Sequence, residues 1–103
     1  HTNSENKPFA EVKLEGKGLL SGITVVNTDR NQHRQLPLKI EVSSDGKTWT
    51  QVFRTEENAA FWKVDLNGKD ITATHVRVSR DRPDDKKDFF HLRGIHVYGK
   101  KLF

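Results

Sequence analysis

Two polar segments hold the residue types best suited to chemistry in this chain of 103 residues. The first, TDRNQHRQ at 28–35, gathers an acid, two guanidinium groups, two amides and an imidazole, contributed by Asp29, Arg30, Asn31, Gln32, His33 and Arg34. Planar donors and acceptors of this kind can form paired hydrogen bonds with neighbouring hydroxyl groups, such as those of a sugar. A solvated turn between strands can have the same composition, so the segment is a candidate binding loop with a structural alternative.

The second segment, DRPDDKKDFFH at 81–91, ends in two adjacent aromatic residues and a histidine. Phe89 and Phe90 would point to opposite sides of a strand, so only one of them can join the core. The other either stacks on a ligand beside His91 or belongs to a small cluster covered by a loop. The charges that precede them are expected to be solvated, and these are Asp84, Asp85, Lys86 and Lys87.

Catalytic constellations are absent from the sequence. There is no cysteine, and the histidines lack the i,i+4 spacing of a helical zinc site; they are His1, His33, His75, His91 and His96. No G-x-S-x-G elbow or glycine-rich phosphate loop occurs, and the acids of 81–88 match no calcium loop. We therefore expect a protein that is not an enzyme and that needs neither cofactor nor metal.

Alternating apolar residues predict strands throughout. In the run LPLKIEVSS, the residues Leu36, Leu38, Ile40 and Val42 share one face, as in a half-buried antiparallel strand. The pair Asp45–Gly46 that follows predicts a hairpin turn. Strands are expected at 9–14, 19–27, 36–44, 48–54, 61–66, 74–80 and 89–99, with no helix.

Short strands with turn residues between them are typical of an antiparallel β-sandwich or barrel, whose loops gather at its ends. The long polar loops are 28–35, 55–60 and 79–88. In the last strand the apolar phase slips, which predicts a bulge at Arg93–Gly94. Trp49 and Trp62 lie within strand patterns and are expected to pack, whereas His96 should point outward.

Length and charge set further limits. The chain is long enough for one domain spanning 1–103, and with no methionine it is expected to be a piece of a longer product. Its net charge of +4 mildly favours anionic partners, but acids and bases are interspersed, which argues against nucleic acid. No apolar run is long enough to predict membrane insertion.

Three stretches carry a family resemblance. KIEVSSDGKTWTQVF, FWKVDLNGKDITATHVRVSR and FFHLRGIHVYGKKL together contain an S-x-D-G-x-x-W strand end, a V-R-V strand and a terminal V-Y-G. With the opening HTNSENKPFAEVKLEGKGLLSGITVVN, they make the whole chain resemble the discoidin family, also called coagulation factor five/eight type C domains.

This resemblance implies an eight-stranded jelly-roll sandwich of the galactose-binding type, with ligand-binding loops at one end. The absence of the cysteine pair found in animal members favours a bacterial module, similar to the thirty-second family of carbohydrate-binding modules. Family members begin with a strand and a calcium loop ahead of the segment that matches His1. That calcium site is therefore not carried over, and an N-terminal strand is expected to be missing. The arginine and asparagine that family lectins place against galactose have candidates here at a different spacing, namely Asn27, Arg30, Asn31 and Arg34.

The leading hypothesis is a non-catalytic carbohydrate-binding module, secreted or at a cell surface, that holds an appended enzyme or surface protein near glycans. Its predicted ligand-binding residues are Asn27, Arg30, Asn31, His33, Arg34, Phe89, Phe90 and His91. The alternative is a structural or protein-interaction domain that packs against other domains of the parent chain. A third possibility, binding of anionic lipid or nucleic acid, predicts steep salt dependence.

Overall fold

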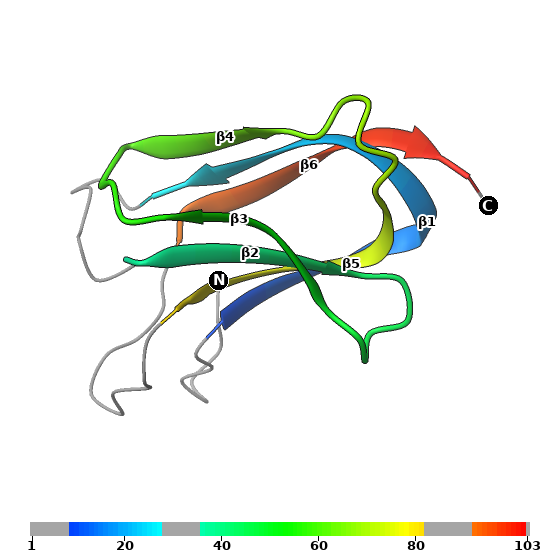
Figure 1. Ribbon diagram of the computed structural model, residues 1–103, viewed down its shortest axis with the longest axis horizontal. Coiled ribbons are helices and arrows are strands. Elements are labelled where there is room, and N and C mark those ends of the chain that lie inside the picture. The colour runs from blue at the N-terminus through cyan, green and yellow to red at the C-terminus, as the bar shows by residue number, and fades with distance from the viewer. Residues whose placement is uncertain (1–8, 28–35, 82–91, 103) are drawn as a thin grey trace.

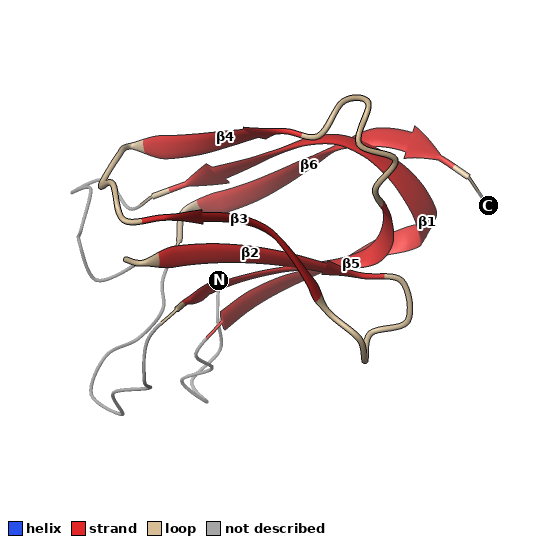
Figure 2. Cartoon of the chain, viewed as in Figure 1, coloured by secondary structure: helices blue, strands red, loops and turns tan. Residues whose placement is uncertain are grey.

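Six antiparallel strands make up the regular structure of this computed structural model, which describes residues 9–27, 36–81 and 92–102. No helix occurs in that part of the chain (Figure 2). The strands are β1 (Phe9–Val26), β2 (Leu38–Ser43), β3 (Thr50–Thr55), β4 (Phe61–Asp65), β5 (Thr72–Arg80) and β6 (Gly94–Lys101). The predicted all-β class is therefore confirmed.

The strands form two facing layers that share β1 (Figure 1). The first part of β1 pairs with β5, which extends the order β3-β2-β5 to a four-stranded layer. The last part of β1 pairs with β4 on one side and with β6 on the other, giving a three-stranded layer. Because one strand belongs to both layers, the sheet curls into a sandwich.

The two runs predicted at 9–14 and 19–27 are one strand of 18 residues, so the prediction of two separate strands is wrong. Between them β1 bends: its register with β5 shifts between Lys13 and Gly18, and Gly16 has a φ of +91°. A residue with a side chain is strained at that φ, whereas glycine adopts it readily. The bend carries β1 from one layer to the other.

The predicted bulge at Arg93–Gly94 is also wrong, because β6 begins only at Gly94 and the phase slip precedes the strand. The irregularity lies instead in β1, where the register with β6 shifts between Leu20 and Gly22. Ser21 is the extra residue, and Gly99 faces the distorted stretch from β6.

The core fills the space between the layers with alternate residues from each strand. Its buried apolar residues are Leu20, Ile23, Val25, Leu38, Ile40, Val42, Trp62, Val64, Leu66, Ala73, Val76, Val78 and Leu92. The buried face predicted for the strand at 36–44 is confirmed in β2. The packing of Trp62, which is 6% exposed, is confirmed as well. His96 points outward as expected.

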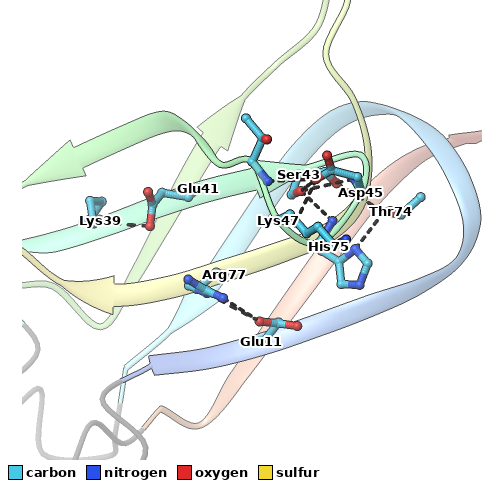
Figure 3. Close-up of polar contacts among 11 residues, drawn as sticks. Glu11, Lys39, Glu41, Ser43, Asp45, Lys47, Thr74, His75 and Arg77 are labelled. Atoms are coloured by element: carbon cyan, nitrogen blue, oxygen red, sulfur yellow. Dashed lines mark hydrogen bonds and ion pairs between the residues drawn. The ribbon is translucent and has the colours of Figure 1, made fainter.

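The Asp45–Gly46 turn closes the β2–β3 hairpin as the sequence indicated (Figure 3). Gly46 has a φ of +79°. The Asp45 Oδ1 atom accepts hydrogen bonds from the backbone N–H groups of Thr48 at 2.8 Å and Lys47 at 2.7 Å. Those bonds, with one from the Ser43 hydroxyl, hold the pKa of the Asp45 carboxyl below its ordinary value.

Candidate functional site

One terminus of each of the six strands lies at the same end of the sandwich, and we call this end the loop pole. In the three-stranded layer, Val26 pairs with Phe61 on one side and with Gly94 on the other. In the four-stranded layer, Leu38 pairs with both Thr55 and Arg80. The described residues of the loop pole are Asn27, Leu36, Pro37, 55–61, Arg80, Asp81 and 92–94, at the left of Figure 1.

The two polar segments singled out in the sequence connect to this pole. Segment 28–35 follows Asn27, and segment 82–91 runs from Asp81 to Leu92. Backbone hydrogen bonds tie these flanking residues to one another: Asp81 N–H donates to Pro37 O at 2.8 Å, and Arg93 N–H donates to Val26 O at 2.9 Å. Both segments therefore start and finish at the same end of the fold.

Of the eight predicted ligand-binding residues, the structure describes Asn27. The other seven lie outside the described residues, and they are Arg30, Asn31, His33, Arg34, Phe89, Phe90 and His91. Their roles stay predictions.

Asn27 is buried, with 1% of its surface exposed, and it holds the link between β3 and β4. Its side-chain Nδ2 donates to Ala59 O at 2.9 Å and to Asn58 Oδ1 at 3.3 Å. Its backbone N–H donates to Ala60 O at 2.9 Å. These three hydrogen bonds fix the 58–60 loop, and we call this role of Asn27 the bracket. Direct contact with a ligand stays a prediction for this residue.

The same loop is fixed from its other side. The Trp62 indole Nε1–H donates to Glu57 O at 2.9 Å, and Glu57 N–H donates to Thr55 Oγ1 at 3.1 Å. A buried indole that reaches the backbone of the preceding loop both packs the core and sets the path of that loop. The 56–60 connection is thus a rigid part of the loop pole.

Among the described residues of the loop pole, Phe61 is the large hydrophobic residue that is exposed, and it was not among the predicted ligand-binding residues. Its side chain is 52% exposed, and the Lys63 ammonium group lies 5.9 Å from the centre of its ring. The alternation of β4 could have revealed it, since Trp62 and Val64 point inward and Phe61 has the opposite phase. An exposed ring beside donors can stack on the apolar face of a sugar.

A small ionic network lies beside this pole on the four-stranded layer. The Arg54 Nε atom donates to Asp81 Oδ2 at 2.7 Å, and the same guanidinium lies 3.1 Å from Glu56. The Lys39 ammonium lies 3.7 Å from Asp81. The hydrogen bond from Arg54, aided by the charge of Lys39, lowers the pKa of the Asp81 carboxyl. The carboxylate is thereby kept ionised at the point where segment 82–91 begins.

The outer face of the four-stranded layer carries a stack of two aromatic rings around a cation. The Arg77 guanidinium lies 4.3 Å from the centre of the Phe9 ring and 3.9 Å from that of Trp49. Arg77 also pairs with Glu11 at 3.3 Å (Figure 3). Trp49 therefore packs as the sequence predicted, on the outside of the sheet. The contacts of Arg77 with both rings reinforce the strand order.

A metal centre is not assembled in the described ranges. No group of three or more histidine, aspartate or glutamate residues there is arranged to hold a metal ion. In the same ranges, no helix has the length and apolar character needed to cross a bilayer. The described part of the loop pole includes a loop held by hydrogen bonds and the exposed ring of Phe61.

The family model described as NedA-like, galactose-binding domain, of the factor five/eight type C class, matches residues 1–78. The chain belongs to this family, which confirms the family resemblance. No curated protein matches the chain.

Solved structures share the fold. The CpGH89CBM32-6 module produced by Clostridium perfringens is 21% identical, with a TM-score of 0.68 over 94% of this chain and 72% of that one. The CpGH89CBM32-5 module of the same organism, in complex with GalNAc-β-1,3-galactose, is 17% identical, with a TM-score of 0.69 over 92% of this chain and 68% of that one. A Streptococcus pneumoniae fucose-binding module, SpX-3, is 20% identical, with a TM-score of 0.62 over 90% and 66%. The predicted galactose-binding type of β-sandwich is thereby confirmed.

Proposed function

We propose that this chain is a non-catalytic carbohydrate-binding module whose loop pole binds glycans. The observation that carries the proposal is the convergence of all six strand ends at the pole to which both polar segments connect. Solved modules of the same fold support it, since they are named for binding fucose or are in complex with GalNAc-β-1,3-galactose. The relevant ligands are therefore neutral saccharides of the galactose and fucose kind.

In this proposal the exposed ring of Phe61 supplies a stacking surface, and Phe89 or Phe90 supplies another. Arg30, Asn31 and Arg34 donate hydrogen bonds to hydroxyl groups, with His33 and His91 beside them. Asn27 supports the site, because its hydrogen bonds keep the 58–60 loop and Phe61 in place. The rigid rim limits the entropy lost on binding.

We further propose that the module is extracellular and holds a neighbouring catalytic domain or surface protein near glycans. Open sugar sites bind weakly, and repeated attachment raises the overall avidity without any new contact. A dissociation constant in the millimolar to micromolar range corresponds to about 4 to 8 kcal/mol, which a few hydrogen bonds and one stacked ring supply.

Retention on immobilised glycans tests this proposal with paired variants. The Arg30→Ala/Arg34→Ala double variant is expected to lose retention on galactose- and fucose-bearing gels while its melting temperature is unchanged. Phe61→Ala should weaken binding about tenfold, since covering the exposed half of a phenylalanine contributes about 1 to 1.5 kcal/mol. Phe61→Tyr keeps the ring and serves as the matched control.

The opposite pattern supports the structural alternative. Retention that survives in the double variant, together with a fall in melting temperature or a loss of assembly with the parent protein, would contradict the proposed function.

A further inference from the structure

The outer face of the three-stranded layer presents a regular array of side chains away from the loop pole. Ile23 and Val25 of β1 are buried, so Gly22, Thr24 and Val26 lie on the outer side. The register places Lys63 and His96 on either side of Thr24, and Asp65 and Tyr98 on either side of Gly22. One aromatic ring, a cation and a carboxylate thus surround the middle of the face.

A hollow of about 340 Å³ lies at this point of the face. It is lined by Gly22, Ile23, Thr24, Lys63, Val64, Asp65 and Tyr98. Gly22 makes room for it, because the position between Asp65 and Tyr98 carries no side chain. A Cβ at Gly22 would also approach Val64 O to 3.1 Å, so glycine suits this close approach of β1 and β4.

Several side chains around the hollow can still contact a ligand. Tyr98 is 53% exposed, so about half of the residue is accessible to a ligand. Within the described part of the chain, Lys63 forms no ion pair, but its ammonium group lies 5.9 Å from the centre of the Phe61 ring. In the same ranges Asp65 accepts one hydrogen bond, from Asn67 N–H at 3.0 Å. Lys63 and Asp65 are two residues apart on one strand face, about 7 Å from each other along the strand.

We propose that this hollow is a second saccharide site, in which a sugar ring stacks on Tyr98 while its hydroxyls bond to Lys63 and Asp65. The proposal rests on the proposed function of the loop pole and extends it to another surface. An ammonium donor and a carboxylate acceptor beside an aromatic ring match a ligand that has an apolar ring face and hydroxyls on its edge. The volume lies at the lower end of the range for small-ligand sites.

A protein partner fits this face poorly. A stable protein interface buries about 800 Å² on each side, and charged residues are depleted at its centre. Here the centre holds Lys63, Asp65 and His96 around a single exposed ring. A compact ligand with several hydroxyl groups is the better match in size and in polarity.

A second site changes how the module binds. Gly22 and Val26 are four residues apart on β1, so the hollow lies ~13 Å along the strand from the row that contains Phe61. Two weak sites at this separation allow one branched glycan, or two neighbouring chains, to be held at once. The gain in avidity then comes from the effective concentration at the second site.

Amide NMR titration of the chain with galactose, fucose and GalNAc-β-1,3-galactose tests the site. At concentrations on the order of tens of millimolar, we expect saturable shifts at Gly22, Thr24, Lys63, Asp65 and Tyr98 with at least one of these sugars. Tyr98→Ala should weaken that binding at least about fivefold and leave the dissociation constant at the loop pole within about twofold. Tyr98→Phe retains the ring and should bind, and Asp65→Asn provides a second variant with an exposed, conservative change.

The outcomes separate the two proposals. Shifts confined to the loop pole, with the amides around Tyr98 silent for all three sugars, would overturn the second site and leave the proposed function intact. Shifts around Tyr98 that persist undiminished in both Tyr98→Ala and Asp65→Asn would also overturn it. No shift anywhere would overturn both proposals together.

Discussion

Replacing Gly99 by alanine is expected to destabilise the domain by about 3 kcal/mol or more, near the upper end of what overpacking costs. A Cβ at Gly99 would collide with the backbone of β1, at the Leu19 carbonyl group and at Leu20 Cα. Neither group can turn aside as a side chain can, because Leu19 and Leu20 are themselves paired with β6 in the distorted stretch beside Ser21. The strands must therefore separate, and the melting temperature should fall by about 12 °C or more.

Gly18→Ala is the matched control for this change. Gly18 lies in the same strand pair, and its added Cβ would meet nothing closer than Lys100 O at 3.7 Å, which is ordinary contact. This variant should stay within about 1 kcal/mol of the parent. Urea unfolding, followed by the combined fluorescence of Trp49 and Trp62, measures both. Equal urea midpoints for the two variants would contradict the close approach of β6 to β1 at Gly99.

Asn27→Ala is the second change with a large expected effect. It removes the donor to the part-buried Ala59 O, and the loss of this 2.9 Å hydrogen bond costs about 1 to 3 kcal/mol. Asn58→Ala removes the longer hydrogen bond of 3.3 Å to Asn27 Nδ2 and leaves the bond to Ala59 O in place, so it should cost less, about 1 kcal/mol. Hydrogen exchange at the amides of 56–60 should accelerate in Asn27→Ala, because the bracket that holds this loop is lost.

The same variant separates the two roles of Asn27. A bracket predicts that unfolding stability and glycan binding fall together. A residue that only contacts the ligand predicts weaker binding at unchanged stability. Unchanged stability in Asn27→Ala would therefore contradict the bracket.

Much of the fold follows from local patterns in the sequence. The alternation of Leu38, Ile40 and Val42 correctly indicated which face is buried, and the Asp45–Gly46 pair correctly placed a turn. The continuity of β1 was missed because Glu15, Gly16 and Lys17 are exposed at the bend and interrupt the apolar phase. A strand that crosses from one layer to another depends on pairing with two different partners, which no single segment encodes.

The candidate site was predicted only in outline. The polar composition of 28–35 and 82–91 drew attention to these segments, and the strand register brings their flanking residues together at the loop pole. Ligand binding at this pole stays a prediction. Phe61 and Tyr98 could have been found, since Phe61 has the phase opposite to the buried Trp62, and Tyr98 has the phase opposite to Ile95 and Val97, which pack against the core. The hollow beside Gly22 could not, because it depends on the register of β4 and β6 against β1.

The V-Y-G motif that supported the family resemblance gains a physical reason from the structure. Tyr98 is exposed on the outer face, whereas Val97 packs against the core. Gly99 permits the close contact with β1 at the bulge between Leu20 and Gly22. Val97 thus serves packing and Gly99 serves strand approach, whereas Tyr98 carries the stacking role proposed for the second site.

Binding of the wild-type chain to an array of neutral and charged glycans is the decisive measurement for the proposed function. We expect specific retention on glycans that carry terminal galactose, N-acetylgalactosamine or fucose. We also expect retention to change little with salt, because hydrogen bonds and stacking carry the interaction. An array with no bound glycan at millimolar sugar, or one on which only anionic glycans bind and salt removes them, would contradict the proposed function.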